Sequence, residues 1–159
     1  MPVTLSPLIP PDATAAHALA IAALGDAPYA DSMRAPLDGA LATASDEYAA
    51  IVARDGDALV GVAVFGETAG ARGAGRLYLV AVAAGARRRG IATALTEAAC
   101  VHLRSRGARF VVIELPEEPG LQPAHAIARR AGFRAEGRVE DYVRDGVGLM
   151  VLRRELRDP

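Results

Sequence analysis

Apolar residues recur along this chain with two different spacings, which predict a mixture of strands and helices. Short aliphatic runs bounded by Gly, Pro or Asp indicate strands, whereas apolar residues three or four positions apart indicate helices. Strands are expected at residues 3–9, 48–54, 58–65, 76–83, 110–115, 133–142 and 147–155, and helices at residues 13–24, 32–43, 91–103 and 124–131. This order is typical of an α/β or α+β protein, and no linker or repeat divides it, so residues 1–159 are expected to form a single domain.

Polar residues at the ends of these runs predict how the elements begin and connect. Asp55-Gly56-Asp57 and Arg144-Asp145-Gly146 are turn signals that join neighbouring strands into hairpins. Asp12 is expected to cap the first helix. The run at 76–83 is apolar on both faces, so we expect it to be a central strand, with the run at 110–115 as another.

Composition and charge exclude several classes of function. A net charge of −1 at pH 7 argues against nucleic acid as the main partner. The chain has no Lys, so it lacks both the Lys of a P-loop and the Schiff-base Lys of a pyridoxal enzyme. The histidines (His17, His102 and His125) and the one cysteine are too dispersed to indicate a zinc site, so no metal is expected.

The chain is expected to work in the cytoplasm and away from membranes. No apolar run approaches the ~20 residues that span a bilayer, and the N-terminal residues do not resemble a secretory signal. The single cysteine, Cys100, excludes an internal disulfide and is compatible with a reducing compartment. Because Cys100 lies in the apolar pattern of a helix, it is expected to be a small buried side chain and not a nucleophile.

The most informative segment joins the strand at 76–83 to the helix at 91–103. Three consecutive arginines, Arg87 to Arg89, stand where this helix begins, beside Gly90. Cations are unfavourable at a helix N-terminus by roughly 0.3–1 kcal/mol each. The unpaired backbone amides of the same place bind anions. We therefore expect this turn to bind an anionic ligand, the alternative being a solvated basic helix start.

The same segment carries a family motif. Val82, Arg87, Gly90 and Ala92 form the run Val-x-x-x-x-Arg-x-x-Gly-x-Ala, which contains the pattern (Gln/Arg)-x-x-Gly-x-(Gly/Ala). The run lies between a buried strand and an amphipathic helix, and Ala131-Gly132-Phe133 follows the next helix. On these residues and on the order of its elements, the chain resembles the GNAT superfamily of acyl-CoA-dependent N-acetyltransferases. The resemblance implies a GNAT fold: a mixed, mostly antiparallel seven-stranded sheet, splayed between strands 4 and 5 and flanked by about four helices.

The resemblance also implies acetyl-CoA as co-substrate, held by the turn and by the strand before it. Backbone amides from Arg88 to Thr93 would bind the pyrophosphate, while arginine side chains would offset phosphate charge. Gly90 would let the chain approach the phosphate closely. The pantetheine arm would pair with strand 4 as an added strand does. The expected cofactor-binding residues are Val80, Ala81, Val82, Arg87, Arg88, Arg89, Gly90, Ile91, Ala92 and Thr93.

Amide formation needs a base for the ammonium proton and usually an acid for the leaving thiolate. Many family members place a Glu on the fifth strand as the base, and Glu114 is the only charge in the run at 110–115. A carboxylate in an apolar strand is expected to be buried, which would tune it for acid–base work. The alternative is a Glu at the strand end that reaches solvent or pairs with an Arg.

The usual acid of the family is missing from this chain. Relatives commonly carry a Tyr four residues before the Gly-Phe pair, where this sequence has Ala128. His125, one helical turn earlier, is a candidate replacement, the alternative being a partly buried histidine bonded to a carbonyl. Tyr142, near the last turn, is a second candidate acid or substrate contact, the alternative being a tyrosine that packs on the sheet.

The sequence does not select the acceptor amine. The expected reaction is direct transfer in a ternary complex to a primary amine of a small molecule or peptide. The alternative function is a non-catalytic acyl-CoA-binding sensor, and a homodimer is compatible with the resemblance. Residues with side chains suited to contact an acceptor are Tyr29, Asp31, Met33, Arg34, Glu117 and Glu118.

Overall fold

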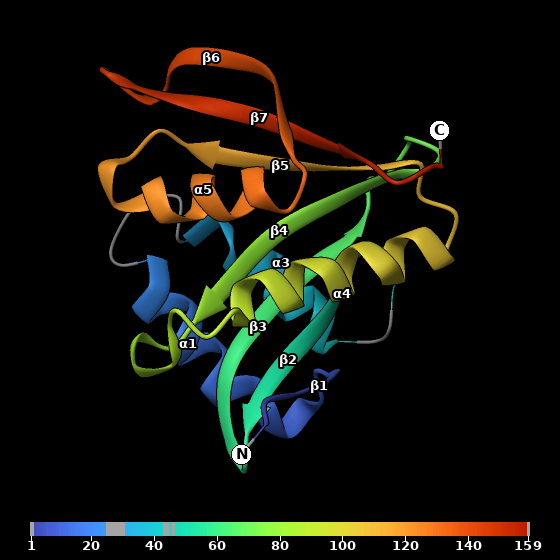
Figure 1. Ribbon diagram of the computed structural model, residues 1–159, viewed down its shortest axis with the longest axis vertical. Helices are drawn as coiled ribbons and strands as arrows, with labels where there is room; N and C mark the ends of the chain where they lie inside the picture. Colours follow the sequence, from blue (N-terminus) through green and yellow to red (C-terminus); the bar gives the residue numbers. More distant parts are fainter. Residues whose placement is uncertain (1, 25–30, 43–44, 46, 159) are drawn as a thin grey trace.

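The computed structural model of the chain describes residues 2–24, 31–42, 45 and 47–158 (Figure 1). The strands are β1 (Thr4–Pro7), β2 (Ala49–Asp55), β3 (Ala58–Glu67), β4 (Ala74–Val82), β5 (Phe110–Pro116), β6 (Arg134–Arg144) and β7 (Val147–Glu155). The α-helices are α1 (Ala13–Leu24), α3 (Arg34–Leu41), α4 (Ile91–Ser105) and α5 (Gln122–Arg130). Short 3-10 helices occupy Pro10–Asp12, Ala84–Ala86 and Pro119–Leu121.

The strands form one seven-stranded sheet in the order β1-β2-β3-β4-β5-β7-β6. Every neighbouring pair is antiparallel except β4 and β5, which are parallel. These two strands pair only from Ala74↔Phe110 to Arg76↔Val112, and beyond this point they diverge (Figure 1). The expected fold, a mixed sheet splayed between its fourth and fifth strands, is therefore confirmed.

Helices cover both faces of the sheet (Figure 1). One face packs against α1 and α3 through an apolar cluster that includes Val52, Val62 and Leu79. The other face packs against α4 and α5 through a second cluster that includes Phe65, Leu95, Leu103, Val111, Phe133 and Leu152. These two layers leave the divergence of β4 and β5 as the main irregularity of the sheet.

Gly61 of β3 allows α4 to lie close to the sheet. A Cβ on Gly61 would lie 2.9 Å from Leu95 Cδ1 and 3.0 Å from Ile91 Cγ2, which is tighter than ordinary packing permits. The N-terminal half of α4 is thereby held against β3. The turn with Arg87 to Arg89 leads directly into this half of α4.

The N-terminal segment differs from its prediction. The expected strand at 3–9 is shorter because a 3-10 helix begins at Pro10. Asp12 lies within this 3-10 helix, and its carboxylate accepts hydrogen bonds from the Ile9 amide (3.1 Å) and from Arg54 Nη2 (2.5 Å). The predicted cap of the first helix is therefore wrong. Arg54 of β2 engages the Asp12 carboxylate, and this partner is too distant in sequence to be read from a local pattern.

Candidate active site

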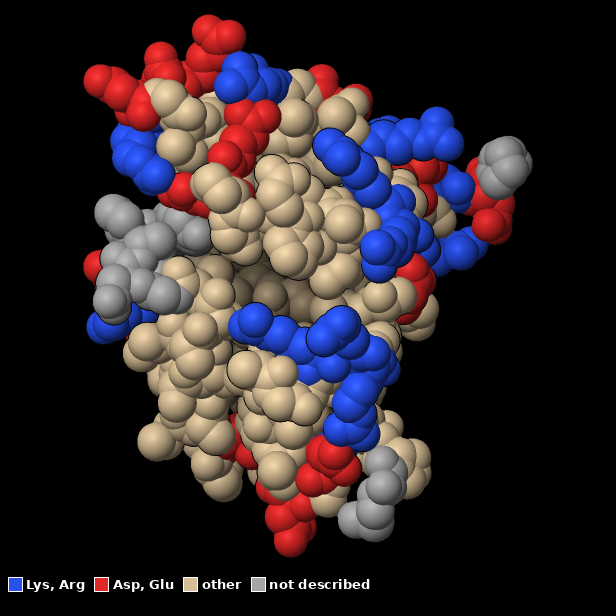
Figure 2. Space-filling model, turned by 60° about the vertical axis from the view of Figure 1, so that its left-hand side comes forward, with Lys and Arg blue, Asp and Glu red and all other residues tan. Residues whose placement is uncertain are grey.

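The candidate site is the gap between β4 and β5. Because the ladder between them ends at Arg76↔Val112, the rest of β4 presents an unpaired edge toward β5. Figure 2 shows a hollow in this side of the molecule, bordered below by basic side chains, which are all arginine because the chain has no Lys. The expected residues Val80, Ala81 and Val82 lie on the β4 side of the gap.

A β-bulge changes the direction of side chains along β4. Val64 pairs with Leu79 and Phe65 pairs with Leu77, so Tyr78 is an extra residue with no partner on β3. Bulges re-aim side chains next to functional sites. Here Tyr78 and Leu79 both belong to the cluster on the α1 face, close to the point where β4 and β5 separate.

The start of α4 has backbone amides that the helix itself does not use. The first helical hydrogen bond joins the Ala94 amide to the Gly90 carbonyl at 2.9 Å, so the amides of Ile91, Ala92 and Thr93 have no partner within the helix. Gly90 is the N-cap and has a left-handed φ of 74°, which glycine adopts without steric cost. A Cβ on Gly90 would meet nothing within 4 Å. The turn therefore has both the donors and the space that an anion requires.

The three arginines lie in this turn and not in the helix, which begins at Ile91. Arg87 Nε donates to the Val82 carbonyl at 3.5 Å, and Arg89 Nη1 donates to Asp55 Oδ2 at 2.7 Å. The hydrogen bond from Arg89 and its positive charge hold the pKa of Asp55 below the ordinary value. The charge of Arg89 is thus balanced by Asp55 of the β2–β3 hairpin. Arg87 and Arg88 are exposed, and no ion pair with another described residue balances their charges.

Glu114 lies at the closed end of the gap, but it is not buried as expected. Its side chain is 36% exposed, and its Oε2 accepts a hydrogen bond from Arg76 Nη2 at 2.6 Å. The expectation of burial is wrong because even-numbered residues of β5 face away from the α4 cluster, which takes Val111 and Ile113. This arrangement is the alternative given above, a Glu that pairs with an Arg, and the base role stays a prediction.

His125 is buried, with 5% of its surface exposed. Its Nε2 lies 2.9 Å from the Pro116 carbonyl oxygen, which can only accept, so Nε2 carries the proton and donates. This bond ties α5 to the end of β5 and matches the alternative reading of a histidine bonded to a carbonyl. Ala128, where relatives carry the Tyr, is 4% exposed and belongs to the α4-side cluster.

The remaining predicted residues are spread around the gap. Tyr142 is 63% exposed on β6, so it does not pack on the sheet. Glu117 and Glu118 of the loop after β5 are bound to Arg138 and Arg144 of β6. Asp31 and Arg34 pair with each other at 3.3 Å. Tyr29 lies outside the described residues, and so does most of the segment 25–33.

Sequence reasoning missed a cluster on the α1 face of the gap. The Arg76 guanidinium carbon lies 5.1 Å from the centre of the Tyr78 ring, and that ring lies 5.3 Å from the ring of Tyr48. Burial raises the pKa of Tyr78, and the nearby Tyr48 and the carboxylates of Glu47 and Glu114 add to this rise, while the charge of Arg76 opposes it. The net effect is a raised pKa, so the phenol is neutral. A signal was present, since Arg76 is the only charge in β4 as Glu114 is in β5.

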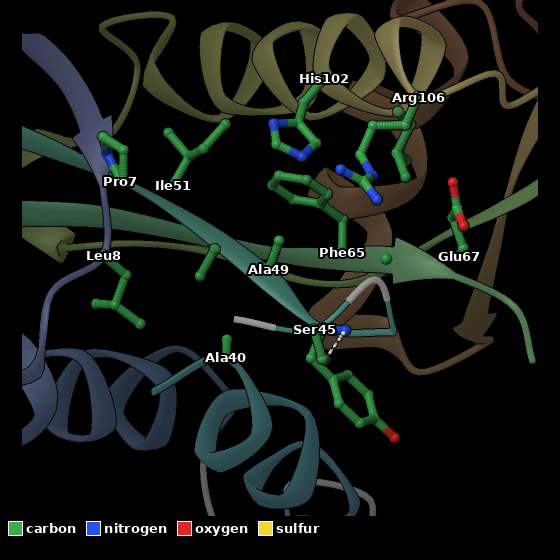
Figure 3. Close-up of a pocket in the computed structure, with 14 residues that line it drawn as sticks. Pro7, Leu8, Ala40, Ser45, Ala49, Ile51, Phe65, Glu67, His102 and Arg106 are labelled. Atoms are coloured by element: carbon green, nitrogen blue, oxygen red, sulfur yellow. Dashed lines mark hydrogen bonds between the residues drawn. The ribbon is translucent and has the colours of Figure 1, made fainter. Parts of the chain in front are cut away.

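A second cavity of about 310 Å³ lies apart from the gap, between α3 and the C-terminal half of α4 (Figure 3). His102 projects into it from α4 and Arg106 from the residue that follows this helix. Phe65 lies beneath them, with its ring centre 5.2 Å from that of His102 (Figure 3). Ala40 faces them from α3. Of the predicted site residues that the structure describes, none lines this cavity, whereas Tyr48, the neighbour of Tyr78, does.

Over residues 2–24, 31–42, 45 and 47–158, no group of three or more His, Cys, Asp or Glu side chains is placed to hold a metal ion. No helix in this part of the chain is both long enough and apolar enough to cross a membrane.

Comparisons with known proteins agree with this geometry. Residues 17–133 match the model of the acetyltransferase (GNAT) family. A structure assigned to the GNAT family, from Desulfovibrio desulfuricans, is similar to this chain, with 26% identity and a TM-score of 0.88 over 98% of this chain and 100% of that one. No significant match is found among curated proteins.

Two further solved structures share the fold. An N-acetyltransferase from Staphylococcus aureus Mu50 has 17% identity and a TM-score of 0.81, over 99% of this chain and 100% of that one. The ribosomal-protein-S18-alanine N-acetyltransferase from Escherichia coli has 16% identity and a TM-score of 0.79, over 99% of this chain and 96% of that one. At these identities the likeness concerns the arrangement of the elements alone.

Proposed function

Because this chain belongs to the GNAT family of acetyltransferases, we propose that it transfers the acetyl group of acetyl-CoA directly to a primary amine of a small molecule or peptide. The observation that carries the proposal is the divergence of β4 and β5 beyond Arg76↔Val112, beside a helix start whose first amides have no partner within the helix. A gap between two strands admits an extended arm, and a helix start binds a pyrophosphate. The two features adjoin each other along the chain.

The turn before α4 suits a pyrophosphate in three respects. The amides of Ile91, Ala92 and Thr93 offer donors, and the space beside Gly90 is open. Arg88, which is exposed, adds a cation that offsets phosphate charge. From this turn the unpaired edge of β4 leads back toward Arg76 over roughly 20 Å, at about 3.3 Å per residue. This length is comparable to that of an extended phosphopantetheine arm, so the thioester would lie near the closed end of the gap.

Glu114 is proposed as the base, since it is the only charge of β5 and lies at that closed end. Acetyl-CoA supplies the thioester. The Glu114 carboxylate takes one ammonium proton, directly or through water, and so frees the nitrogen lone pair. The nitrogen then bonds to the thioester carbon, the carbon–sulfur bond breaks, and the thiolate leaves. A second nitrogen proton passes to solvent or to the thiolate, which gives the amide and CoA.

Direct transfer is favoured over an acyl-enzyme because the only cysteine is unsuited to attack. Cys100 is 3% exposed on α4, and burial raises its pKa to about 11. A thiol in this state holds almost no thiolate near neutral pH. The amine is therefore the nucleophile that meets the thioester.

The chain has no tyrosine at position 128 to protonate the leaving thiolate, and Ala128 is buried. His125 could serve only by giving up the hydrogen bond from Nε2 to Pro116. Tyr142, exposed on β6, stays a candidate. A thiolate leaves without an obligatory acid, and positioning of the reactants can itself supply about 7–11 kcal/mol. The buried Ala128 is also what favours the alternative, an acyl-CoA-binding sensor.

The binding claim is tested by a charge placed in the turn. Gly90→Glu is expected to weaken CoA binding at least 100-fold, because its carboxylate would enter the phosphate position, and calorimetry measures the affinity. Gly70→Glu is the matched control, since Gly70 has a similar φ of +77° and open space around it. We expect this control to bind like the wild type, and equal affinity of both variants would contradict the assignment.

The catalytic claim is tested by thiol release from acetyl-CoA with a panel of amines. Glu114→Gln is expected to lower kcat at least tenfold and to remove the acid limb of the pH–rate profile. His125→Ala tests the histidine in the same assay. Profiles unchanged in both variants would refute both assignments, and tight acetyl-CoA binding without turnover of any amine would establish the sensor.

A further inference from the structure

We propose that the acceptor is an amine with a carboxylate close to its nitrogen, as in a free amino acid, and that Arg76 binds this carboxylate. The inference rests on the proposed function, because it names the acceptor class of the same reaction. It is carried by the Arg76–Glu114 pair and by where this pair lies in the gap.

The pair occupies the closed end of the gap. Arg76 belongs to the last paired position of β4 and β5, and Glu114 lies two residues beyond its partner Val112. These are the only charged side chains of their strands. An acyl group carried along β4 from the turn would therefore arrive beside one cation and one anion.

The pair also leaves hydrogen-bonding capacity open. Its one hydrogen bond joins Arg76 Nη2 to Glu114 Oε2 at 2.6 Å. Within the described part of the chain, Arg76 Nε and Nη1 and Glu114 Oε1 make no hydrogen bond. By contrast, the Arg154–Glu97 pair uses both carboxylate oxygens, at 2.5 and 3.1 Å. The side chains of Arg76 and Glu114 are 34% and 36% exposed, so a ligand can reach them.

The Arg76 guanidinium is held in place from a second side. Its carbon lies 5.1 Å from the centre of the Tyr78 ring, which a neighbouring Tyr48 ring supports at 5.3 Å. A guanidinium fixed by ring stacking loses little freedom when it binds a carboxylate, and its planar fork matches two oxygens. The bulge at Tyr78 brings this ring to the α1 face, beside Arg76.

A free amino acid has the charges that complement this pair. Its carboxylate can accept from the open donors of Arg76, and its ammonium can donate to Oε1 of Glu114. Both contacts can form at once, because the two groups of the amino acid are bonded to the same carbon and the two side chains lie next to each other on adjacent strands. As the ligand carboxylate takes over Arg76, Glu114 is released from its ion pair and can accept the ammonium proton. A plain amine cannot compete for Arg76, so Glu114 would stay paired and be a poorer base.

The test compares acceptors that differ only in the carboxylate. Each of the common amino acids is assayed by thiol release beside its amide and its decarboxylated amine. We expect kcat/KM of the preferred amino acid to exceed that of its amide at least tenfold. Arg76→Gln should bring this ratio close to one, mainly by raising KM for the amino acid, while calorimetry shows unchanged affinity for CoA. Arg104→Gln, which breaks the exposed pair with Asp158, should keep the wild-type ratio.

Two results would overturn the inference while leaving the proposed function intact. The first is turnover of amides or plain amines at rates equal to those of the amino acids, as expected for a peptide acceptor. The second is an unchanged ratio in Arg76→Gln. If acetyl-CoA binds and no amine is turned over, the proposed transfer fails. Binding of amino acids to the CoA-bound protein, measured by calorimetry, then tests the role of Arg76 separately. Binding that requires the amino acid carboxylate and is lost in Arg76→Gln would support this role, and absence of binding would overturn it.

Discussion

Single residues in this chain obtain their roles from partners that lie far away in the sequence. The apolar pattern around Glu114 predicted a buried base, yet Arg76, 38 positions earlier, pairs with it at the surface of the gap. The helical pattern placed His125 one turn from Ala128, where relatives carry a tyrosine, but His125 Nε2 donates its proton to the Pro116 carbonyl. Residue types and positions were predictable because they follow local patterns. Their partners depend on which strands meet, which local patterns do not contain.

Asp12 gives a stability prediction with a defined pH dependence. Burial raises the pKa of this carboxyl, but hydrogen bonds from Arg54 and the Ile9 amide outweigh burial and lower the pKa below its ordinary value of 3.8. A lowered pKa in the folded state means that the carboxylate stabilises the fold above this value and that the contribution is lost as the pH falls further. Asp12→Asn should lower the free energy of unfolding by about 2 kcal/mol at pH 7.

Urea unfolding at pH 7 and at pH 3 measures this effect. The difference between wild type and Asp12→Asn should shrink at the lower pH, because at pH 3 the unfolded wild-type chain protonates this carboxyl, whose ordinary pKa is 3.8, and is thereby stabilised relative to the folded state. Asp158→Asn is the control, since it breaks an exposed pair with Arg104 and should change the free energy of unfolding by less than about 0.5 kcal/mol. A difference that stays the same at both pH values would contradict the role given to the Asp12 charge.

At the scale of elements, the sequence predicts strands and helices well where a local period persists. The hairpin turns at Asp55 and Asp145 and the helix that begins at Ile91 all appear near their predicted positions. The bulge at Tyr78 was not predictable, because it arises from a register shift against Val64 and Phe65 of β3. Such a shift is a property of two paired strands, and the period of one strand does not reveal it.

The close packing of α4 on Gly61 is expected to position the turn before α4, which is the proposed phosphate site. Gly61→Val is expected to push Ile91 and Leu95 off β3, because even one Cβ would lie 2.9 Å from Leu95. Overpacking of this kind costs about 1–3 kcal/mol in the free energy of unfolding. Since the displaced end of α4 carries the amides of the proposed phosphate site, CoA affinity should also fall by about tenfold, which corresponds to roughly 1.4 kcal/mol of binding free energy.

Urea unfolding and calorimetry with CoA measure these two effects of Gly61→Val. Gly137→Val is the matched control, because Gly137 also lies in a strand and a Cβ there would meet nothing within 4 Å. We expect this control to keep both stability and affinity. Loss of stability in Gly61→Val with unchanged CoA affinity would show that the turn is positioned independently of α4.

For the whole molecule, periodicity predicted the order of the elements but not which strands pair. The pairing of strands in the sheet was predicted from the resemblance to the GNAT superfamily. The splay was confirmed, and the backbones of β4 and β5 pair at three positions, from Ala74↔Phe110 to Arg76↔Val112. The proposed acceptor site could not be predicted, because Arg76, Tyr78 and Glu114 come together only once β4 and β5 are placed side by side. The motif proposed to bind the cofactor is local, so it could be recognised from the sequence alone.

A ligand that fills the gap should act on both halves of the sheet at once. Acetyl-CoA is expected to slow hydrogen exchange of amides in the turn before α4, along the open edge of β4 and in β5. Adenosine 3′,5′-bisphosphate has phosphates but no pantetheine arm, so it should slow exchange in the turn alone. Exchange measured by mass spectrometry tests this without any turnover, so the result holds for an enzyme and for a sensor alike. Equal protection of β4 and β5 by both ligands would mean that the arm does not lie between the strands, because only the arm distinguishes the two compounds there.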